Sequence, residues 1–238
     1  MKILLVGYGK MGKAIEAIAL QRGHEIVGKI GSKNAQDIHL YNASNTDVCI
    51  EFSLPELAFS HIQTLLKAGI PTLSGTTGWL QHLPEVERLC QEHKGTFFYA
   101  SNYSIGVNLF FKVNQFLAQR MKLYPEYKVH LEEIHHTQKK DAPSGTAITL
   151  AQDIIKELPD YDMWVNSETN NPKELPIISL RTDEVPGTHY VRYQSAIDTI
   201  EISHTAHSRT GFAQGAVLVA EWLPAQKGMC TMNDFLPL

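Results

Sequence analysis

The sequence predicts an α/β protein, in which a parallel sheet covered by helices on both faces is followed by a second, α+β domain with a mixed sheet. Three observations predict this class. Strand-like and helix-like segments alternate through the first hundred residues, and this alternation ends after residue 105. The chain has 238 residues, 43% of them hydrophobic and 19% charged, so it can bury a sizeable core and is neither disordered nor fibrous.

The first hundred residues repeat a strand–helix unit. Short runs of apolar β-formers predict strands, and apolar residues at helical spacing predict helices. The predicted strands are 2–6, 25–30, 48–52, 72–74 and 96–100, and the predicted helices are 11–22, 55–68 and 84–93. Such alternation is typical of a parallel sheet with helices on both faces.

The second half begins with a long apolar helix, predicted over 107–123. The next segment alternates apolar and polar residues with a period of two, which predicts a strand with one solvated face. Turn signals between further apolar runs predict an antiparallel or mixed sheet. The predicted strands are 127–133, 175–181, 188–193 and 197–204, with helices at 147–158 and 211–223 and a polar loop at 159–172.

Charge, hydropathy and cysteine content exclude several classes of protein. The formal net charge of −4 provides no field that would attract nucleic acid. The apolar stretch at the start of the sequence, residues 3–6, is too short for a membrane span or a signal peptide. We therefore expect a cytoplasmic protein. Cys49, Cys90 and Cys230 are odd in number and widely spaced, which predicts buried thiols without disulfides or a zinc ribbon.

A glycine-rich loop follows the first predicted strand and opens the first predicted helix. It reads Gly7-Tyr8-Gly9-Lys10-Met11-Gly12, the G-x-G-x-x-G pattern. The glycines permit a tight turn, close backbone approach to a diphosphate, and close helix packing. The N–H groups of the helix N-terminus favour the negative charge. The sequence therefore predicts a Rossmann-type dinucleotide-binding domain, with a simple tight turn as the alternative.

The second predicted strand lacks the acid that commonly bonds the ribose hydroxyls of a dinucleotide. That carboxylate is expected about 20 residues after the loop, but the strand ends in Lys29-Ile30-Gly31-Ser32-Lys33. Ser32 and Lys33 can donate to a 2′-phosphate, and Lys10 adds positive charge. The sequence therefore predicts NADPH or NADH as cofactor, with NADPH favoured. The alternative is that Lys33 is a solvated loop residue.

A dense polar cluster occupies residues 132–146, at the end of a predicted strand. His135, His136 and Lys139 supply groups that can exchange a proton or stabilise an anion. Ser144 precedes an apolar-periodic segment and is predicted as a helix N-cap. The backbone N–H groups of Gly145 and Thr146 could then bind a substrate carboxylate. The cluster predicts a small anionic substrate.

Other interpretations of the histidines are open. A pair of histidines in a loop can simply be exposed at the surface, without a role in catalysis. Metal binding by His135 and His136 is disfavoured, because adjacent residues point apart on a strand and no carboxylate or cysteine is recognised at ligand spacing. We therefore expect no metal. His204 and His207 are predicted to pack at a strand end.

These motifs together resemble the dihydrodipicolinate reductase family, also called 4-hydroxy-tetrahydrodipicolinate reductases. The resemblance runs almost end to end, and the string HHTQKKDAPSGT at 135–146 is its most specific part. Further matching stretches are DVCIEFS at 47–53, GTTG at 75–78, SNYSIGVN at 101–108 and EISHTA at 201–206.

The resemblance implies roles for particular residues. His135 would be the acid/base and Lys139 the proton donor, with His136, Ser144, Gly145 and Thr146 at the substrate. The residues implied on the nicotinamide side are Gly75, Thr76, Thr77, Ala100, Ser101, Asn102 and Tyr103. It also implies a dinucleotide-binding domain (1–103 and 210–238) to which the C-terminal segment 228–236 returns. The remaining 104–209 would form a substrate-binding and tetramerisation domain.

The resemblance implies NAD(P)H-dependent reduction of 4-hydroxy-tetrahydrodipicolinate to tetrahydrodipicolinate, in the diaminopimelate route to lysine. A related-fold amino-acid or semialdehyde dehydrogenase and a non-catalytic nucleotide sensor are the alternatives. The sequence departs from the family pattern at the missing ribose acid, at Lys140, where an apolar residue is common, and at Asp183, where glycine is usual. The chain is also shorter than many relatives. None of these departures replaces a residue that the resemblance implies in catalysis or substrate binding.

Overall fold

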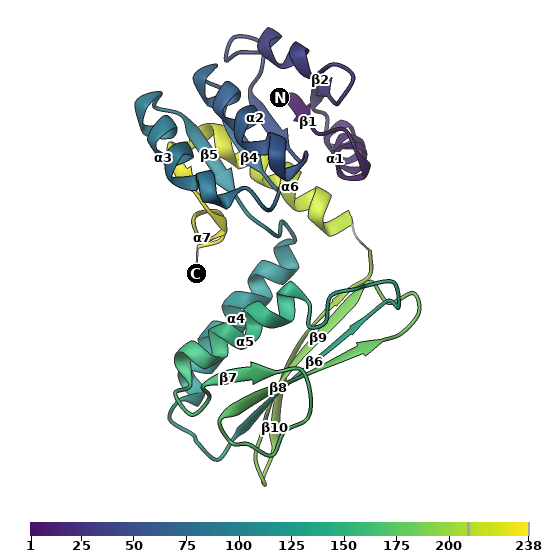
Figure 1. Ribbon diagram of the computed structural model, residues 1–238, viewed down its shortest axis with the longest axis vertical. Helices are drawn as coiled ribbons and strands as arrows, with labels where there is room; N and C mark the ends of the chain where they lie inside the picture. The colour runs from purple at the N-terminus through teal and green to yellow at the C-terminus, as the bar shows by residue number, and fades with distance from the viewer. Residues whose placement is uncertain (209, 238) are drawn as a thin grey trace. The chain divides into compact units, whose positions relative to one another are not determined.

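The chain divides into two compact units in the computed structural model, which describes residues 1–208 and 210–237. The first unit comprises Met1–Ile105 together with Thr210–Leu238, and the second comprises Gly106–Arg209. The first unit is therefore built from two stretches of chain, drawn in purple to blue and in yellow in Figure 1. Within the described residues, no helix is both long enough and apolar enough to cross a membrane.

Six parallel strands form the sheet of the first unit, in the order β11-β5-β4-β3-β1-β2. The strands are β1 (Lys2–Val6), β2 (Glu25–Ile30), β3 (Val48–Glu51), β4 (Thr72–Ser74), β5 (Thr96–Tyr99) and β11 (Gly228–Cys230). β3 lies between β1 and β4 and is buried along its whole length, as expected for a parallel strand covered on both faces. The predicted parallel sheet is confirmed.

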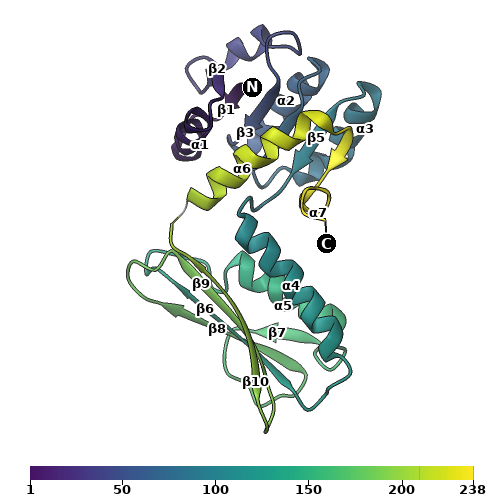
Figure 2. The same ribbon diagram turned by 180° about the vertical axis from the view of Figure 1, so that it is seen from behind.

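Helices cover both faces of this sheet (Figure 2). Side chains alternate along β1, so Ile3 and Leu5 pack with α1 (Lys10–Gln21) and α6 (Thr210–Trp222), whereas Leu4 and Val6 pack on the other face. That second face is covered by α2 (Pro55–Lys67) and α3 (Leu83–Glu92). Among its described residues the unit also contains three short 3₁₀ helices, η1 (Ala35–Leu40), η2 (Leu80–His82) and η3 (Leu223–Ala225).

The C-terminal segment completes the first unit, as the resemblance implies. β11 pairs in parallel with β5, with Gly228 opposite Thr96. The next turn, α7 (Met232–Phe235), begins with a capping box formed by Thr231 and Asp234. The three cysteines are free and buried, which confirms their prediction as structural thiols.

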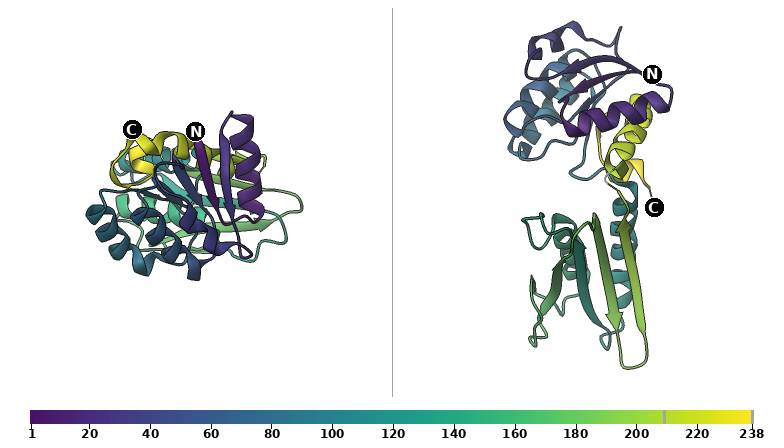
Figure 3. Two further views of the ribbon diagram at one scale, coloured as in Figure 1. Left: turned by 90° about the horizontal axis from the view of Figure 1, so that it is seen from above. Right: turned by 90° about the vertical axis from the view of Figure 1, so that its right-hand side faces the viewer.

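The second unit is a five-stranded mixed sheet with two helices packed on one face, α4 (Ile105–Met121) and α5 (Gly145–Glu157) (Figure 1). The strand order is β10-β9-β6-β8-β7. β6 is antiparallel to β9 but parallel to β8, and β9 and β10 form the long hairpin drawn in light green in Figure 3. The strands are β6 (Lys128–His135), β7 (Met163–Val165), β8 (Glu174–Arg181), β9 (Gly187–Gln194) and β10 (Thr199–Ala206).

Two details of the second unit differ from the sequence prediction. The segment 159–172, predicted as a loop, contains β7, whose Trp164 pairs with Leu175 of β8. That prediction was wrong because a three-residue strand flanked by polar turns carries no periodic signal. The strand predicted to end at residue 133 continues to His135, because its backbone remains paired with β8.

Candidate active site

The glycine loop of the first unit has the geometry of a diphosphate cradle. Gly7 has a φ of +91°, and a Cβ atom there would lie 1.9 Å from the carbonyl oxygen of Phe52. A Cβ atom on Gly12 would lie 2.4 Å from the carbonyl oxygen of Gly7. Nothing lies within 4 Å of the corresponding position on Gly9, so the loop is open on the side where a diphosphate would approach. The residues present therefore fit a dinucleotide.

A cavity of about 500 Å³ lies beside this loop. Its walls bring the glycine loop together with the predicted Ser32 and Lys33 at the end of β2. Among the described residues, exposed Lys33 has no ion-pair partner. Asn34, which the sequence analysis did not single out, shapes this turn by accepting from the Gly31 N–H at 2.9 Å. Lys10 and Met11 lie in the first turn of α1, which begins without a side-chain cap.

A second lysine beside the same cavity was not recognised from the sequence. The Lys29 ammonium lies 2.5 Å from a carboxylate oxygen of Glu16 and 5.0 Å from the ring centroid of Tyr8. The Tyr8 hydroxyl donates to the same carboxylate. Glu16 thus neutralises Lys29, whereas Lys33 makes no ion pair within residues 1–208 and 210–237, which supports Lys33 as the cation for a 2′-phosphate.

The residues implied on the nicotinamide side follow the carboxyl ends of β4 and β5, on the same edge as the glycine loop. Buried Glu51 organises this edge by accepting from the hydroxyls of Ser74, at 2.5 Å, and Thr76, at 2.9 Å. A Cβ atom on Gly75 would lie 2.1 Å from the Phe52 ring. Only glycine therefore fits at position 75. The Thr76 side chain points inward, toward Glu51.

The other implied nicotinamide-side residues differ in exposure. Tyr103 is buried and donates to the Ser74 carbonyl at 2.8 Å, so its side chain supports the edge from within. Asn102 accepts from the Ser104 N–H at 2.9 Å, while Thr77 and Ser101 are exposed and Ala100 is buried. Their roles toward a nucleotide stay predictions.

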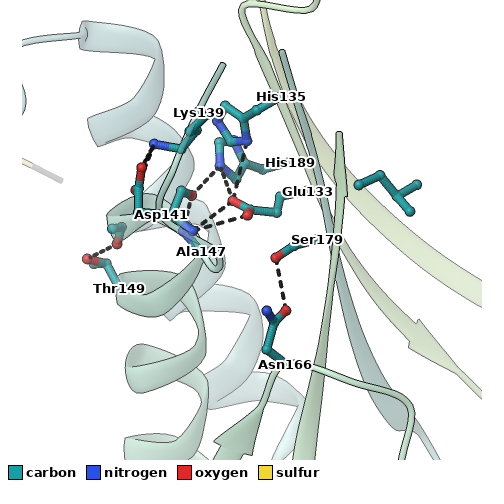
Figure 4. A network of polar contacts seen from close by, with 12 residues as sticks. Glu133, His135, Lys139, Asp141, Ala147, Thr149, Asn166, Ser179 and His189 are labelled. Carbon is teal, nitrogen blue, oxygen red and sulfur yellow. Dashed lines mark hydrogen bonds and ion pairs between the residues drawn. The ribbon is translucent and has the colours of Figure 1, made fainter. Parts of the chain in front are cut away.

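In the second unit, two buried imidazoles, a half-buried guanidinium and a backbone N–H surround one carboxylate, that of Glu133. Figure 4 shows Glu133 with His135 and His189. Glu133 of β6 is 0% exposed. Its Oε2 atom lies 3.5 Å from Nδ1 of His135 and 3.6 Å from Nε2 of His189, and its Oε1 atom lies 3.2 Å from the Arg181 guanidinium. The Ser144 N–H donates to both oxygens at 3.1 Å. The predicted acid/base His135 is thus joined to the predicted substrate-binding turn.

Burial and these contacts set the charges of the cluster. Burial lowers the pKa of His135 to about 4, against the opposing effect of Glu133. Burial alone would raise the pKa of Glu133, but the contacts with His189 and Ser144 outweigh it and hold that pKa well below its usual range. At neutral pH the cluster therefore contains an ionised carboxylate and a neutral His135.

The predicted helix N-cap is confirmed, because the Ser144 hydroxyl accepts from the Ala147 N–H at 3.2 Å. The first turn of α5 therefore presents the backbone N–H groups of Gly145 and Thr146, and nothing lies within 4 Å of a Cβ position on Gly145. This open helix N-terminus suits an anionic group.

Lys139 and its loop lie next to these groups. The Lys139 ammonium is paired with Asp141 at 2.7 Å, and its backbone N–H donates to the carbonyl of His136. Asp183, one of the departures from the family pattern, accepts from the Thr137 hydroxyl at 2.6 Å and so ties this loop to the β8–β9 turn. His136 lines a cavity of about 520 Å³ on this side of the unit.

The sequence prediction gave no role to Glu133, Arg181 or His189, although a signal for Glu133 was present. Residues two apart share one face of a strand, so Glu133 and His135 had to lie together. The statement that no carboxylate lies at ligand spacing was therefore wrong. Glu133, His135 and His189 place ligand-type atoms within 4.8 Å of one another. The stacking of His204 on Phe110, with ring centroids 6.0 Å apart, confirms its packing role.

An open dinucleotide loop in one unit, and a buried imidazole–carboxylate cluster beside a lysine in the other, define a pyridine-nucleotide-dependent oxidoreductase. Residues 1–103 match the family model for the N-terminus of dihydrodipicolinate reductase, and residues 106–236 match the model for its C-terminus. The chain belongs to the dihydrodipicolinate reductase family.

Individual relatives agree with this assignment. A 4-hydroxy-tetrahydrodipicolinate reductase of Christiangramia forsetii is 48% identical over 236 residues, covering 99% of this chain and 98% of the relative. One from Staphylococcus carnosus is 35% identical over 98% of this chain and 99% of the relative. The solved structure of dipicolinate-bound dihydrodipicolinate reductase from Paenisporosarcina sp. TG-14 has a TM-score of 0.80, with 22% identity and 99% of each chain covered, and shows the same fold.

The fold is shared with other dehydrogenases. An amine dehydrogenase from Mycobacterium smegmatis has a TM-score of 0.59 at 12% identity, covering all of this chain and 96% of the other. This similarity shows the fold alone. The dehydrogenase alternative raised by the first domain is therefore not favoured, because the family match covers both units.

Proposed function

We propose that this protein reduces 4-hydroxy-tetrahydrodipicolinate to tetrahydrodipicolinate in the diaminopimelate route to lysine. The observation that carries the proposal is the buried Glu133 carboxylate, which holds His135 and the N-terminus of α5 in one cluster. The named activity of the relatives over almost the whole chain supports it.

In this proposal the first unit, with the C-terminal segment, binds the nucleotide. The diphosphate lies on Gly7, Gly9 and Gly12, where the open face of the loop and the uncapped α1 N-terminus provide N–H donors. The nicotinamide supplies a hydride when it is bound. Ser32 and Lys33 favour NADPH over NADH, because they offer a hydroxyl and an exposed ammonium where a ribose-binding acid is absent from the sequence.

The second unit binds the substrate and supplies the proton. The backbone N–H groups of Gly145 and Thr146, with His136 and Ser144, hold the substrate carboxylates. In the overall change a hydride replaces the 4-hydroxyl group, which leaves with one proton as water. Because His135 is neutral at pH 7, Lys139 is the group that gives the proton to the leaving hydroxyl, and His135 relays a proton back to Lys139.

We also propose a cytoplasmic homotetramer. The two helices of the second unit cover only one face of its sheet. On the open face Arg192 lies 2.5 Å from Glu201 and 3.4 Å from Glu132, and Leu180 is 42% exposed. This extended face of mixed character is suited to pairing with another copy. Light scattering that gives the mass of a monomer would contradict the tetramer.

The function is tested by following nucleotide oxidation with enzymatically generated 4-hydroxy-tetrahydrodipicolinate. The wild-type protein should turn over, and His135→Ala should lower kcat by ~10²–10⁴-fold with nucleotide affinity unchanged. Nucleotide binding without oxidation would favour the sensor alternative. Turnover with amino acids or semialdehydes, but not with this substrate, would favour the dehydrogenase alternative.

A further inference from the structure

Glu133 is a fully buried carboxylate that belongs to neither the predicted catalytic pair nor the predicted substrate-binding set. An ionised carboxylate without water is stable in a protein only if donors surround it. Here a backbone N–H, a guanidinium and two imidazoles face it, all within 3.6 Å. The site therefore holds the charged form of Glu133.

The register of the sheet brings these groups together. Glu133 and His135 are two residues apart on β6 and share the face that packs on the helices. His189 of β9 is directly opposite Glu133, and Arg181 of β8 is directly opposite His135. Ser144 then joins the N-terminus of α5 to the same carboxylate. One side chain thus connects three strands and a helix.

The carboxylate also determines where the imidazole protons lie. An ionised carboxylate can only accept hydrogen bonds, so a ring nitrogen that faces it is stable when it carries hydrogen. Nδ1 of His135 is buried and makes no hydrogen bond with the described residues, and the acceptor that faces it is Oε2 of Glu133, 3.5 Å away. A hydrogen on Nδ1 leaves the lone pair of neutral His135 on Nε2. A Cβ atom on Gly187 would lie 3.0 Å from Nε2, so glycine at this position keeps room beside that nitrogen.

We propose that Glu133 is a positioning residue for the reduction, which fixes His135 as the Nδ1–H tautomer and ties it to the substrate-binding N-terminus of α5. Nε2 of His135 is then the nitrogen that accepts or returns a proton. The catalytic part of this inference rests on the proposed function, because it requires His135 to act on the substrate. The tautomer itself is a property of the free protein.

The same three side chains could be taken for metal ligands, since Glu133, His135 and His189 are a typical donor set. Arg181 argues against this interpretation. Its guanidinium donates to Oε1 of Glu133 at 3.2 Å and to the Asp141 carbonyl at 2.6 Å. The positive charge that a metal ion would supply is thus already present, and a divalent ion beside it would be repelled.

The test compares the wild-type protein with Glu133→Gln and with Glu132→Gln as a matched control. Glu132 is the neighbouring residue on β6, and it forms an ion pair with Arg192 on the opposite face of the strand. Ring ¹⁵N spectra, with His135 assigned from a His135→Gln variant, report the tautomer. Nucleotide oxidation gives kcat, and titration with NADPH gives the nucleotide Kd.

We expect neutral His135 to be the Nδ1–H tautomer in the wild-type protein and in Glu132→Gln. In Glu133→Gln the Nε2–H form should become populated and kcat should fall by ~10²-fold or more, with the nucleotide Kd unchanged. A purely structural role would leave the tautomer as it is. The inference is overturned if wild-type His135 is mainly the Nε2–H form, a measurement that does not depend on any Glu133 variant folding.

The inference is also overturned if Glu133→Gln keeps the wild-type tautomer, or keeps kcat within twofold of the wild-type value. These outcomes are distinct from failure of the proposed function, which is seen as no substrate-dependent oxidation by the wild-type protein. In that case the spectra still decide the tautomer, and the catalytic part falls with the function.

Discussion

His135 illustrates how the surroundings of a single residue determine its chemistry. An exposed histidine is partly protonated near neutral pH, but burial lowers the pKa of His135 to about 4. The residue is therefore a base at pH 7. Lys139 differs because its ammonium lies 2.7 Å from the carboxylate of Asp141. The cluster thus separates a proton acceptor from a proton donor.

The lowered pKa of His135 predicts instability in acid. The unfolded chain, with the ordinary value of 6.5, binds more protons than the folded chain between pH 6.5 and about pH 4. This contribution to stability is present above pH 6.5 and is lost as the pH falls toward 4. The free energy of unfolding should drop by roughly 2 to 3 kcal/mol from this residue between pH 7 and pH 4.5.

Urea unfolding of the wild-type protein and of His135→Gln at both pH values measures this contribution. The variant should show a shallower pH dependence, whereas His39→Gln, at an exposed position, should behave as the wild-type protein does. The pKa of Glu133 is also lowered, by its contacts. As the pH falls below 4.5, protonation of Glu133 therefore lowers the free energy of unfolding further in both proteins. Equal pH dependence of wild type and His135→Gln would show that the pKa of His135 is not lowered.

Lys33 is expected to determine cofactor preference. It is exposed beside the nucleotide cavity, whereas the neighbouring Lys29 is neutralised by Glu16. Because solvent screens an exposed ion pair, the preference for NADPH over NADH in kcat/KM should be only about fivefold. Lys33→Ala should remove most of it without changing kcat/KM for NADH.

Low ionic strength is needed for this comparison, because salt weakens the contact further. Lys67→Ala, which removes an exposed lysine at the end of α2, is the control and should leave the preference unchanged. If Lys33→Ala has no effect on NADPH, the alternative of a solvated loop lysine is correct.

At the scale of an element, the N-terminus of α5 is the expected binding site for a substrate carboxylate. Gly145→Val places a branched side chain at a position with open space around it, so the helix should form normally. The side chain would occupy the volume that the anion needs, and KM for the dicarboxylate should rise about tenfold or more. Gln152→Val, an exposed position on the same helix, should keep the wild-type KM. A wild-type KM in correctly folded Gly145→Val would show that the N-terminus of α5 does not bind the substrate carboxylate.

Elements with strong local signals could be predicted from the sequence. β6 alternates in period two, and α5 combines helical spacing with a serine cap, so both are found within two residues of their predicted ends. β7 could not be predicted, because its three residues form a strand only by pairing with β8.

The distinction between local sequence signals and pairing of distant segments applies to the candidate site as well. The histidines, the lysine and the Ser-Gly-Thr turn lie in one short segment, where a motif can reveal them. Arg181 lies 48 positions from Glu133 along the chain, and it reaches the cluster only through the pairing of β6 with β8. Register between distant strands depends on the whole sheet, which local sequence patterns do not specify.

At the scale of the molecule, the chain leaves the first unit at residue 105 and re-enters it at residue 210. The C-terminal tail closes that unit, because β11 forms the edge of its sheet and α7 covers part of its core. Cys230 and Met232 are buried there, and the rings of Trp222 and Phe235 lie 5.4 Å apart. The stability of the proposed nucleotide domain should therefore depend on residues far along the chain from the glycine loop.

Deleting residues 228–238 tests this dependence. The deletion exposes the edge of β5 and removes two buried side chains, which should cost roughly 3 to 6 kcal/mol of the free energy of unfolding. Calorimetry should show a melting temperature lower by on the order of 10 °C, together with weaker NADPH binding. Lys227→Ala, at the exposed residue just before β11, should leave both values unchanged. An unchanged melting temperature after deletion would mean that β1 to β5 with α6 form a complete folding unit without the tail.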